Sequence, residues 1–440
     1  MEPLFVLLLV VVVLGVSLAI GVPISFSLCI AGFVGLWIMR DMSAARDTLA
    51  LVFYSATANH TLTVVPLFIV MGHFAYSAGI VEKAYLFAYR WIGGLTGGLA
   101  MATTLTCAIF GAVSGSSVAA TASIGRITVP EMVDRYKYDV SIATGTVAAS
   151  GTLAMIIPPS IVLVVLAPLL EVSVGGLLIA GVVPGILSAF IYMAMIWTRG
   201  RLNPSLMPRP STRIPWRDKA AAIPGLWGVV AIFCAVVLGI YFGVFTPTEA
   251  AAVGAVVALI MLVRAKGRHE WLRTVRESFF ETARTTSMLF FIFVGAMLLL
   301  KLLALSGATV AYARFVGGLP LPPPLIMFGV LLVCIPLGMV MSGLGTVLIA
   351  APLVAPIAYQ FGYDGIWLGI MLVKFAELGS ITPPVCMSVY ALKGVLGPGY
   401  ALTDIMRGTV WFMAMDILTI GILFSFPQIT LWVPQLMMAR

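Results

Sequence analysis

The sequence predicts an all-α polytopic membrane protein made of two similar halves, and three observations support this prediction. The chain has 440 residues, of which 61% are hydrophobic and 10% charged, and its mean hydropathy is +1.11. Its apolar residues run in long uninterrupted blocks, and its helix-breaking prolines recur at a nearly constant spacing. Soluble domains carry roughly 25% charged residues, so the composition excludes a soluble enzyme and a nucleic-acid-binding protein.

The apolar blocks indicate helices and not the strands of an outer-membrane barrel. Barrel strands alternate apolar and polar residues, whereas a helix spans the bilayer with all its backbone hydrogen bonds satisfied internally. The blocks extend over residues 4–39, 48–80, 84–125, 138–198, 222–263, 279–313 and 323–435. Since one crossing needs about 20 residues, several blocks must fold back or break, which predicts about 11 to 14 membrane segments, some of them half-helices.

Proline-containing sites mark where the long blocks are expected to break. Proline disrupts a helix interior but suits the first turn, so each site predicts the end of one helix and the start of the next. In particular, helix N-termini are expected at Pro158 and Pro383. The four sites are Gly21-Val22-Pro23, Pro158-Pro159, Thr246-Pro247 and Pro383-Pro384.

A basic, proline-rich segment divides the chain near its middle. Residues 199–219 hold six Lys and Arg residues against one acidic residue, Asp218, in a chain whose formal net charge is +8. Because cytoplasmic loops of membrane proteins carry an excess of positive charge, we expect this linker to be cytoplasmic. The predicted organisation is a first repeat over residues 1–200, a linker over 201–220 and a second repeat over 221–440.

Four sequence anchors repeat on either side of this linker at a nearly constant interval, close to half the length of the chain. A shared interval across four anchors is hard to obtain by chance, and two halves broken at corresponding positions are typical of a secondary transporter. Spacing alone leaves open whether the repeats are parallel or inverted. The anchor pairs are Pro23 with Pro247, Trp91–Leu95 with Phe315–Leu319, Ser114-Gly115 with Ser342-Gly343, and Pro158-Pro159 with Pro383-Pro384.

The repeated Ser-Gly and Pro-Pro segments are the candidate site. Segments 114–123 and 342–346 are small and rich in hydroxyl groups, as expected of re-entrant hairpin tips, where non-helical backbone lines a cavity. A hard cation such as sodium takes oxygen ligands, and helix N-termini at the Pro-Pro segments would attract an anionic substrate. The alternative is that these small residues only allow close helix packing.

Ionisable residues inside the apolar blocks are further candidates. Lys374 and Glu377 lie one helical turn apart, so they either neutralise each other or have a functional role. Glu249 follows Thr246-Pro247 and is expected to cap a helix. Lys301 and Asp416 also lie in apolar surroundings, and the sequence assigns them no role.

Enzymatic motifs are missing from the sequence, so we expect neither an enzyme nor a cofactor. The chain has three histidines and contains no HExxH, no GxSxG and no GxxxxGK[ST] pattern. Its five cysteines are scattered without metal-binding spacing. A channel or a structural scaffold is left open, but the doubled pattern of broken helices favours alternating access.

Four motifs in order along nearly the whole chain resemble a known family. They are residues 243–252 (GVFTPTEAAA), Ser114-Gly115-Ser116 through Pro130-Glu131-Met132, Gly151 through Ile156-Ile157-Pro158-Pro159-Ser160, and residues 379–384 (GSITPP). Together they resemble the DctM-like large membrane subunit of TRAP (tripartite ATP-independent periplasmic) transporters. The chain departs from the family pattern at Ala154, where glycine is usual, and at Thr121-Ala122.

The resemblance implies an elevator-type ion transporter fold of two inverted repeats. Re-entrant hairpins would lie near residues 98–125 and 335–358, and broken helices at 158–159 and 383–384. The chain would span a bacterial inner (cytoplasmic) membrane and couple sodium to the import of an organic acid, a carboxylate. Its partners would be a small four-helix membrane subunit, expected as a separate chain, and a periplasmic substrate-binding protein.

Carried onto this sequence, the resemblance also implies site residues. One sodium ion would lie among Ser114, Gly115, Ser116, Thr152 and Pro158. The other would lie among Ser342, Gly343, Gly345, Gly379 and Thr382. The substrate would contact Ser117, Thr121, Pro159, Ser160, Thr346 and Pro384. The predicted function is therefore the large permease subunit of a sodium-coupled TRAP importer, and the alternatives are a sodium:dicarboxylate carrier without a binding protein or a non-transporting scaffold subunit.

Overall fold

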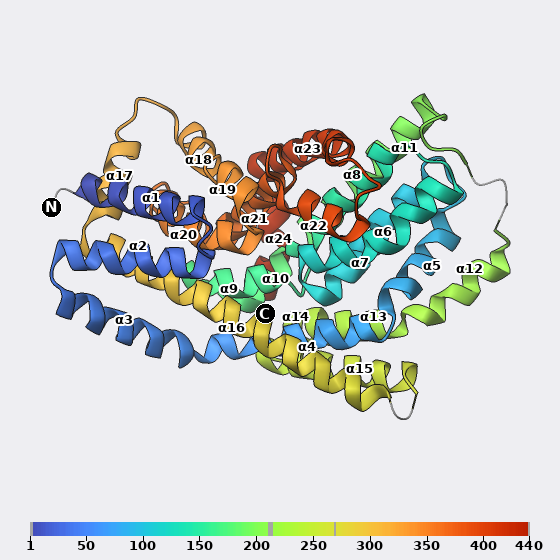
Figure 1. The fold of residues 1–440 in the computed structure, drawn as a ribbon, viewed down its shortest axis with the longest axis horizontal. Helices are drawn as coiled ribbons and strands as arrows, with labels where there is room; N and C mark the ends of the chain where they lie inside the picture. The colour runs from blue at the N-terminus through green and yellow to red at the C-terminus, as the bar shows by residue number, and fades with distance from the viewer. Residues whose placement is uncertain (1–2, 210–213, 268–269, 439–440) are drawn as a thin grey trace.

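A computed structural model describes residues 3–209, 214–267 and 270–438, and all the regular elements within these ranges are helices. Eight of the described helices are long and apolar enough to cross a membrane, and five shorter apolar helices accompany them. The predicted all-α membrane fold is thus confirmed. The helices form an elongated body in which an outer layer partly surrounds an inner bundle (Figure 1).

The outer layer contains the first helices of each half. In the first half they are α1 (Pro3–Ala19), α2 (Ile24–Met39), α3 (Met42–Thr57), α4 (Val64–Ser77) and α5 (Ile80–Ile92), with a 3-10 turn at His60–Thr63. In the second half they are α12 (Trp216–Ala222), α13 (Trp227–Phe233), α14 (Gly239–Tyr241), α15 (Pro247–Ala265), α16 (Glu270–Leu305) and α17 (Ala308–Gly317), with a 3-10 turn at Ile223–Leu226 and a π turn at Cys234–Leu238.

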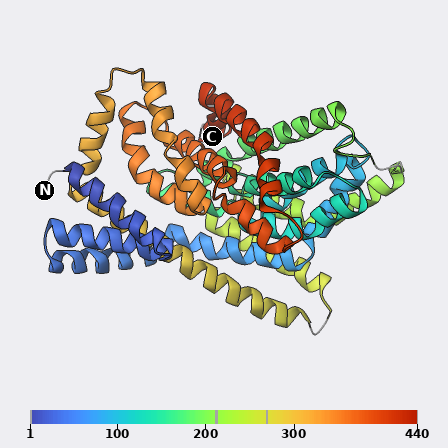
Figure 2. The ribbon, with the colours of Figure 1, turned by 45° about the horizontal axis from the view of Figure 1, so that its top comes forward.

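The long helix α16 connects the parts of the outer layer. It packs on α2, α3 and α4, while α15 packs on α4, and Figures 1 and 2 show α16 running diagonally past the inner bundle. Close contact with α2 depends on glycine: a Cβ at Gly32 would lie 2.9 Å from the Leu298 side chain. The outer helices of both halves therefore form one continuous layer.

Two of the expected helix starts are confirmed in this layer. Helix α2 begins directly after Pro23, and α15 begins at Pro247. The expected cap is also confirmed, because Glu249 Oε2 accepts a hydrogen bond of 2.8 Å from the Thr246 backbone N–H while the Thr246 hydroxyl accepts from the Glu249 N–H. This capping box satisfies two backbone donors that the helix itself leaves free.

The inner bundle contains the later helices of each half. In the first half they are α6 (Gly98–Ser114), α7 (Ser117–Pro130), α8 (Val140–Ser150), α9 (Ile161–Leu166), α10 (Val174–Ala180) and α11 (Val182–Leu202), with a π turn at Glu131–Arg135 and 3-10 turns at Gly151–Met155 and Ala167–Leu169. In the second half they are α18 (Pro323–Leu331), α19 (Cys334–Val340), α20 (Gly343–Gln360), α21 (Gly365–Ile381), α22 (Met387–Leu396), α23 (Leu402–Ser425) and α24 (Gln428–Met438).

Each half places a helical hairpin beside a helix that breaks. Helices α6 and α7 pack on α8 in the first half, and α19 and α20 pack on α21 in the second. The predicted linker, residues 201–220, includes the end of α11, the connection to α12 and the first turn of α12, and its Arg213 is outside the described residues. The division into residues 1–200, 201–220 and 221–440 stays a prediction.

The sequence repeat is visible in the helix caps. Asp139 caps α8 by accepting from the backbone N–H groups of Ser141 and Ile142, and Asp364 caps α21 in the same way. The two aspartates are separated by the same interval as the two Pro-Pro segments. The hairpin tips correct one of the expected anchor pairs. Ser342 caps the second arm of its hairpin, and in the first hairpin the residue that does so is Ser116. Ser342 therefore corresponds to Ser116 and not to Ser114.

The expected helix starts at the Pro-Pro segments are wrong. Helix α9 begins at Ile161 and α22 at Met387, so each helix starts after its proline pair and not at it. The prolines lie instead in the connecting turns, where Pro158-Pro159 and Pro383-Pro384 both have cis peptide bonds. The second proline of each pair has no backbone N–H that could donate to a capping side chain. After the first pair, the residue that caps α9 is Ser160.

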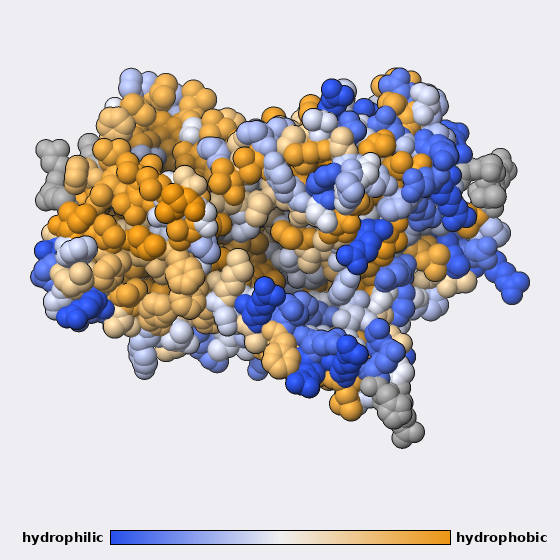
Figure 3. Space-filling model, viewed as in Figure 1, coloured by the Kyte–Doolittle hydropathy of each residue, from blue (hydrophilic) through white to orange (hydrophobic). Residues whose placement is uncertain are grey.

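Apolar side chains on the outer surface indicate where lipid contacts the protein. Hydrophobic surface dominates over α1 and α2 in Figure 3, while polar surface gathers at the opposite end of the molecule and at the lower centre. On α1, Leu8 and Val11 are exposed to 61% and 64%. Such contiguous apolar exposure is unfavourable in water and favourable in a bilayer.

Candidate functional site

The tip of the first hairpin is shaped by a glycine between two serines. Helix α6 ends at Ser114, Gly115 has a φ of +60°, and Ser116 caps α7 by accepting from the Ala119 N–H at 3.3 Å. A Cβ on Gly115 would lie 2.8 Å from the Pro159 carbonyl oxygen. Only glycine combines this backbone conformation with so close an approach. The hairpin tip therefore packs directly on the break between α8 and α9.

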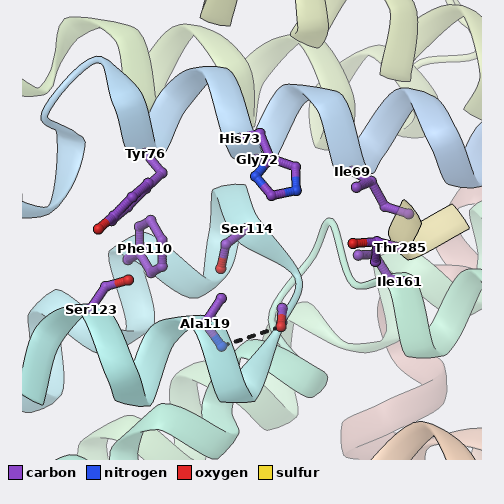
Figure 4. Close-up of a pocket in the computed structure, with 11 residues that line it drawn as sticks. Ile69, Gly72, His73, Tyr76, Phe110, Ser114, Ala119, Ser123, Ile161 and Thr285 are labelled. Atoms are coloured by element: carbon purple, nitrogen blue, oxygen red, sulfur yellow. Dashed lines mark hydrogen bonds between the residues drawn. The ribbon is translucent and has the colours of Figure 1, made fainter. Parts of the chain in front are cut away.

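A pocket of about 290 Å³ opens between this hairpin and the outer helix α4. Binding pockets for small molecules have volumes of roughly 300–1,000 Å³, so this one is at the small end of that range. In Figure 4, His73 and Tyr76 extend from α4 toward Ser114 and Phe110 of the hairpin. The lining residues are Ile69, Gly72, His73, Tyr76, Phe110, Ser114, Ser116, Ala119, Ser123, Ile161 and Thr285.

One polar side chain of the pocket is free to bind a ligand. The Ser114 hydroxyl is buried and has no hydrogen-bond partner in the protein. Buried polar groups are nearly always paired, so an unpaired one marks a place where a ligand or ion is expected. The pocket also lies at the N-terminus of α7, whose free N–H groups and dipole favour an anion.

Other predicted residues of the first half, on α7 and in the break after α8, lie behind this pocket. The Thr121 hydroxyl is buried, faces Gly151 and has no partner, whereas Thr152 donates to the Ala149 carbonyl at 2.7 Å. Ser160 accepts from the Leu163 N–H at 3.3 Å and donates to the Met155 carbonyl. The structure therefore brings the predicted first-half residues to the hairpin tip and the break.

Predicted residues of the second half are more fully hydrogen-bonded. Ser342 accepts from the Gly345 N–H at 3.3 Å, Thr346 donates to the Ser342 carbonyl at 3.1 Å, and Thr382 donates to the Leu378 carbonyl at 2.6 Å. Gly379 is not in an unwound segment but in the last turn of α21. The hydroxyl protons of Thr346 and Thr382 are used within their own helices, so these side chains offer a ligand only the remaining oxygen lone pairs.

The two predicted sodium-binding groups, one from each half, lie next to each other at the second hairpin tip. A Cβ on Gly343 would collide with the Met155 side chain, so this tip contacts the first-half break. Gly345 faces Ile24 of the outer helix α2, and Pro384 is exposed. Of the predicted site residues, Ser114 and Ser116 line the polar pocket, while the other predicted residues do not.

Sequence reasoning missed the outer wall of the pocket. His73 and Tyr76 come from α4 and Thr285 comes from α16, so the wall is built by segments far from either hairpin in sequence. A usable signal was present, because His73 is an ionisable residue inside an apolar helix. No group of three or more His, Cys, Asp or Glu residues that could hold a metal ion occurs in the described parts of the chain.

The intramembrane charged residues have distinct environments. The expected Lys374–Glu377 pair is confirmed, with 2.6 Å between Nζ and Oε2, and Asp416 joins it from α23. Lys301 is exposed on α16. The ion pair therefore belongs to the interior of the inner bundle and is separate from the polar pocket.

Comparison with known families identifies the architecture. Residues 11–429 match the family model described as "Tripartite ATP-independent periplasmic transporter, DctM component". The chain belongs to this family. It is therefore a large permease subunit of the TRAP transporters, a family of transporters and not of enzymes, and it resides in the inner membrane.

Relatives of this DctM chain transport different compounds. It is 37% identical over 388 residues to the C4-dicarboxylate TRAP transporter large permease protein DctM of Pseudomonas aeruginosa, covering 88% of this chain and 89% of that protein. It is 29% identical over 428 residues to the sialic acid TRAP transporter large permease protein SiaM of Vibrio cholerae, covering 94% and 95%. Family membership thus leaves the substrate open.

A solved structure shares the fold of this DctM chain. The Alcanivorax borkumensis YdaH transporter superimposes with a TM-score of 0.62 over 88% of this chain and 89% of that chain, at 12% sequence identity. Identity this low shows similarity of fold and not of function. The overall fold of this chain is therefore shared with that transporter.

Proposed function

We propose that this DctM subunit imports a small organic acid, a carboxylate, with sodium as the coupling ion. The observation that carries the proposal is the polar pocket between the first hairpin and α4. It combines the unpaired Ser114 hydroxyl, the N-terminus of α7 and His73. Hydroxyl and N–H donors beside an imidazole are groups that hydrogen-bond a carboxylate.

The sodium part of the proposal is supported most in the first half. The unpaired hydroxyl oxygens of Ser114 and Thr121 lie on either side of the hairpin tip, close to the break after α8. Oxygen-only ligand sets suit a hard cation. The second predicted group, from Ser342 to Thr382, offers carbonyl oxygens and occupied hydroxyls. A cation near the tip and an anion in the pocket would stabilise each other, which couples the two binding events.

The location of the pocket supports an elevator mechanism. One wall belongs to the inner bundle and the other to the outer layer, so movement of the bundle along α4 would carry the hairpin tips and expose them on alternate sides. In transporters of repeated architecture, alternating access is largely the rigid movement of one bundle against another. The outer layer would form the stationary part.

The partners belong to the proposal as well. The family description names a tripartite transporter, so we propose a small four-helix membrane subunit and a periplasmic substrate-binding protein as the other two components. In one relative, the isethionate TRAP transporter permease protein DctMQ of Oleidesulfovibrio alaskensis, the matched region covers 59% of the protein. The remainder of such a fused chain is where a small subunit would be found.

Reconstituted transport tests this proposal. The chain and its small subunit would be placed in liposomes, and uptake of radiolabelled C4-dicarboxylates and sialic acid would be measured with an inward sodium gradient, with and without the binding protein. We expect uptake that needs both sodium and the binding protein. Sodium-driven uptake without the binding protein would instead indicate an autonomous carrier. No uptake of any carboxylate by the folded complex would indicate a non-transporting scaffold subunit.

A further inference from the structure

A buried charged cluster joins three helices of the inner bundle. The Lys374 ammonium on α21 donates to Glu377 Oε2 at 2.6 Å, to Asp416 Oδ1 on α23 at 2.8 Å and to Ser188 Oγ on α11 at 3.2 Å. All four side chains are completely buried. The three ammonium protons therefore each have a partner, and Lys374 is fully satisfied.

The two carboxylates are not fully satisfied. Glu377 Oε1 and Asp416 Oδ2 are buried and have no hydrogen-bond partner in the protein. The Tyr192 hydroxyl on α11 interacts with Asp416 but does not form a hydrogen bond of normal geometry. Three buried oxygen atoms without a well-formed hydrogen bond in one region are unusual, because buried polar groups are nearly always paired. Each carboxylate uses one oxygen for Lys374, and its other oxygen accepts no well-formed hydrogen bond.

The formal charges of this cluster do not cancel. With both acids ionised, two negative charges face one positive charge, and the cluster carries a net charge of −1. Among the described residues, the other charged and titratable groups that interact with the two acids are Lys374 on α21 and Tyr192 on α11. The Thr152 hydroxyl, in the 3-10 turn after α8, interacts with Tyr192. No second cation among the described residues forms an ion pair with the cluster.

An uncompensated charge in this position is strongly unfavourable. Transfer of a single ion from water to a dry interior costs several kcal/mol even after relaxation, and in practice a buried group takes up or releases a proton instead. One additional proton makes the cluster neutral. It also turns an unpartnered carboxylate oxygen into a hydroxyl donor that the neighbouring acid or Tyr192 can accept.

We propose that Glu377 and Asp416 form a proton-binding site that holds one proton at neutral pH. The site is neutral when Lys374, one carboxylate and one carboxylic acid are present together. The bound proton permits α11, α21 and α23 to share a charged contact in the membrane interior. This proposal rests on the cluster alone and does not depend on which substrate or coupling ion the transporter uses.

The location of the site gives the proton a structural effect on the transport machinery. Glu377 lies one turn before the end of α21, and its carbonyl accepts from the Ser380 hydroxyl at 2.8 Å. Thr409 on α23 donates to the Ile381 carbonyl at 3.1 Å, directly before the break. Loss of the proton would introduce charge repulsion at the point where the broken helix is anchored to α23.

A set of charge-counting variants tests the proposal without using transport. Thermal unfolding of the full chain with its small subunit, in lipid nanodiscs, would be followed from pH 5 to pH 9. Glu377→Gln and Asp416→Asn each replace an acid by a neutral amide and leave one Lys–carboxylate pair. We expect at least one of them to unfold at the wild-type temperature. Lys374→Met leaves two acids and no cation, and the expected result is a large fall in the unfolding temperature.

The double variant Lys374→Met with Glu377→Gln separates charge from packing. It removes the same ammonium as Lys374→Met, but the remaining Asp416 can become neutral by taking up one proton. Partial recovery of stability relative to Lys374→Met is therefore expected. Glu277→Gln on the exposed part of α16 is the control, and its unfolding temperature should stay at the wild-type value.

The pH dependence supplies the sign of the effect. An unfolded carboxyl group loses its proton near pH 4, whereas the folded cluster keeps its proton up to a higher pH. Between these two pH values the folded state binds one more proton than the unfolded state. Stability is then greatest at low pH, and the unfolding equilibrium constant rises up to tenfold per pH unit. This slope should disappear in the amide variant that removes the protonated acid.

Infrared difference spectroscopy observes the proton directly. A carboxylic acid has a C=O stretch that a carboxylate lacks, and we expect such a band in the wild type at pH 7 to be lost in Glu377→Gln or Asp416→Asn. Two results would overturn the proposal. One is that neither variant removes a carboxylic acid band. The other is that added sodium stabilises the wild type and that both amide variants abolish this effect, which would indicate a sodium ion in place of the proton.

Discussion

The two broken helices of the inner bundle share a backbone plan and differ in their chemistry. Both begin with a capping aspartate, Asp139 or Asp364, and both end at a Pro-Pro turn. When the two Pro-Pro turns are aligned, Lys374 and Glu377 correspond to Ala149 and Thr152. A hydroxyl-to-carbonyl bond of 2.7 Å in the first half thus occupies the place of a buried ion pair in the second.

The hairpins differ in a parallel way. The first faces the polar pocket of about 290 Å³ beside His73. The second faces an apolar cavity of about 540 Å³, which α1, α16, α19 and α20 line with residues such as Leu14, Leu299 and Val340. The caps and breaks are repeated because each helix must satisfy its terminal N–H groups. The polar side chains are not under that constraint, so the two halves diverge at these positions.

The largest difference between the halves is expected in transport. Ser116→Leu places an apolar side chain in the polar pocket, and we expect sodium-driven uptake to fall at least about tenfold, equivalent to about 1.4 kcal/mol of activation free energy. Val340→Phe, which enlarges a side chain in the apolar cavity, should leave uptake nearly unchanged. Uptake assays in proteoliposomes would measure both variants, and an equal loss in both would remove the proposed difference between the two cavities.

Sodium activation tests whether the second half also has a role in ion binding. Thr382→Leu removes a hydroxyl next to the second break, and we expect a higher sodium concentration for half-maximal uptake with the fold retained. Sodium titration of uptake, with thermal unfolding as the control for folding, would measure this change. An unaltered titration curve would exclude Thr382 from the predicted second sodium group.

Stability is expected to change next most strongly where hairpin and broken helix touch. In the second half a Cβ at Gly379 would lie 2.9 Å from Gly338 Cα and 2.6 Å from the Ile335 carbonyl oxygen, so Gly379→Ala should cost about 1–3 kcal/mol. The first half already has Ala154 at the corresponding position, and Ala154→Gly should cost no more than about 1 kcal/mol. Thermal unfolding in detergent would compare them, and a larger cost for Ala154→Gly would contradict the packing difference.

The repeated caps should give similar results in the two halves. Asp139 and Asp364 each accept from two backbone N–H groups, so Asp139→Ala and Asp364→Ala should each cost about 1 kcal/mol. The same unfolding measurement applies, with Asp139→Asn and Asp364→Asn as conservative controls that retain a capping oxygen. Strongly unequal effects would mean that the two breaks are not equivalent at their starts.

The smallest effect is expected at the start of the outer helices. Helix α15 has a complete capping box from Thr246 and Glu249, whereas α2 begins after Pro23, which supplies no side-chain cap. Glu249→Ala should therefore lower the unfolding temperature slightly, by less than either aspartate variant, and Ser25→Ala in the first turn of α2 should lower it less still. A larger effect for Ser25→Ala would reverse this order.

Local signals in the sequence predicted the features that depend on nearby residues. Prolines located the breaks, Thr246 and Glu249 predicted their cap, and the spacing of Lys374 and Glu377 predicted their ion pair. The starts of α9 and α22 were placed too early, at the proline pairs themselves, because a Pro-Pro turn precedes a helix as readily as it begins one. Asp139 and Asp364, separated by the same interval as those pairs, were an additional signal of the repeat.

Contacts between distant segments could not be predicted from one sequence. The pocket wall needs α4 and α16 beside the first hairpin, and only the folded chain shows that His73 and Thr285 line the same pocket as Ser114. Likewise, the third member of the buried charged cluster, Asp416, lies on a later helix than Glu377 and reaches the cluster because α23 packs on α21. The sequence placed Asp416 in apolar surroundings but did not indicate its partner.

The length of α16 has a mechanical consequence. The helix has 36 residues, which makes it about 54 Å long, whereas the hydrocarbon core of a bilayer is about 30 Å thick. The exposed Arg273–Glu277 pair keeps its first turns in the polar headgroup region. A helix longer than the bilayer core is accommodated largely by tilt, and packing on α2, α3 and α4 sets the angle. Since α16 also contributes Thr285 to the pocket wall, its tilt also determines the depth of this wall in the membrane.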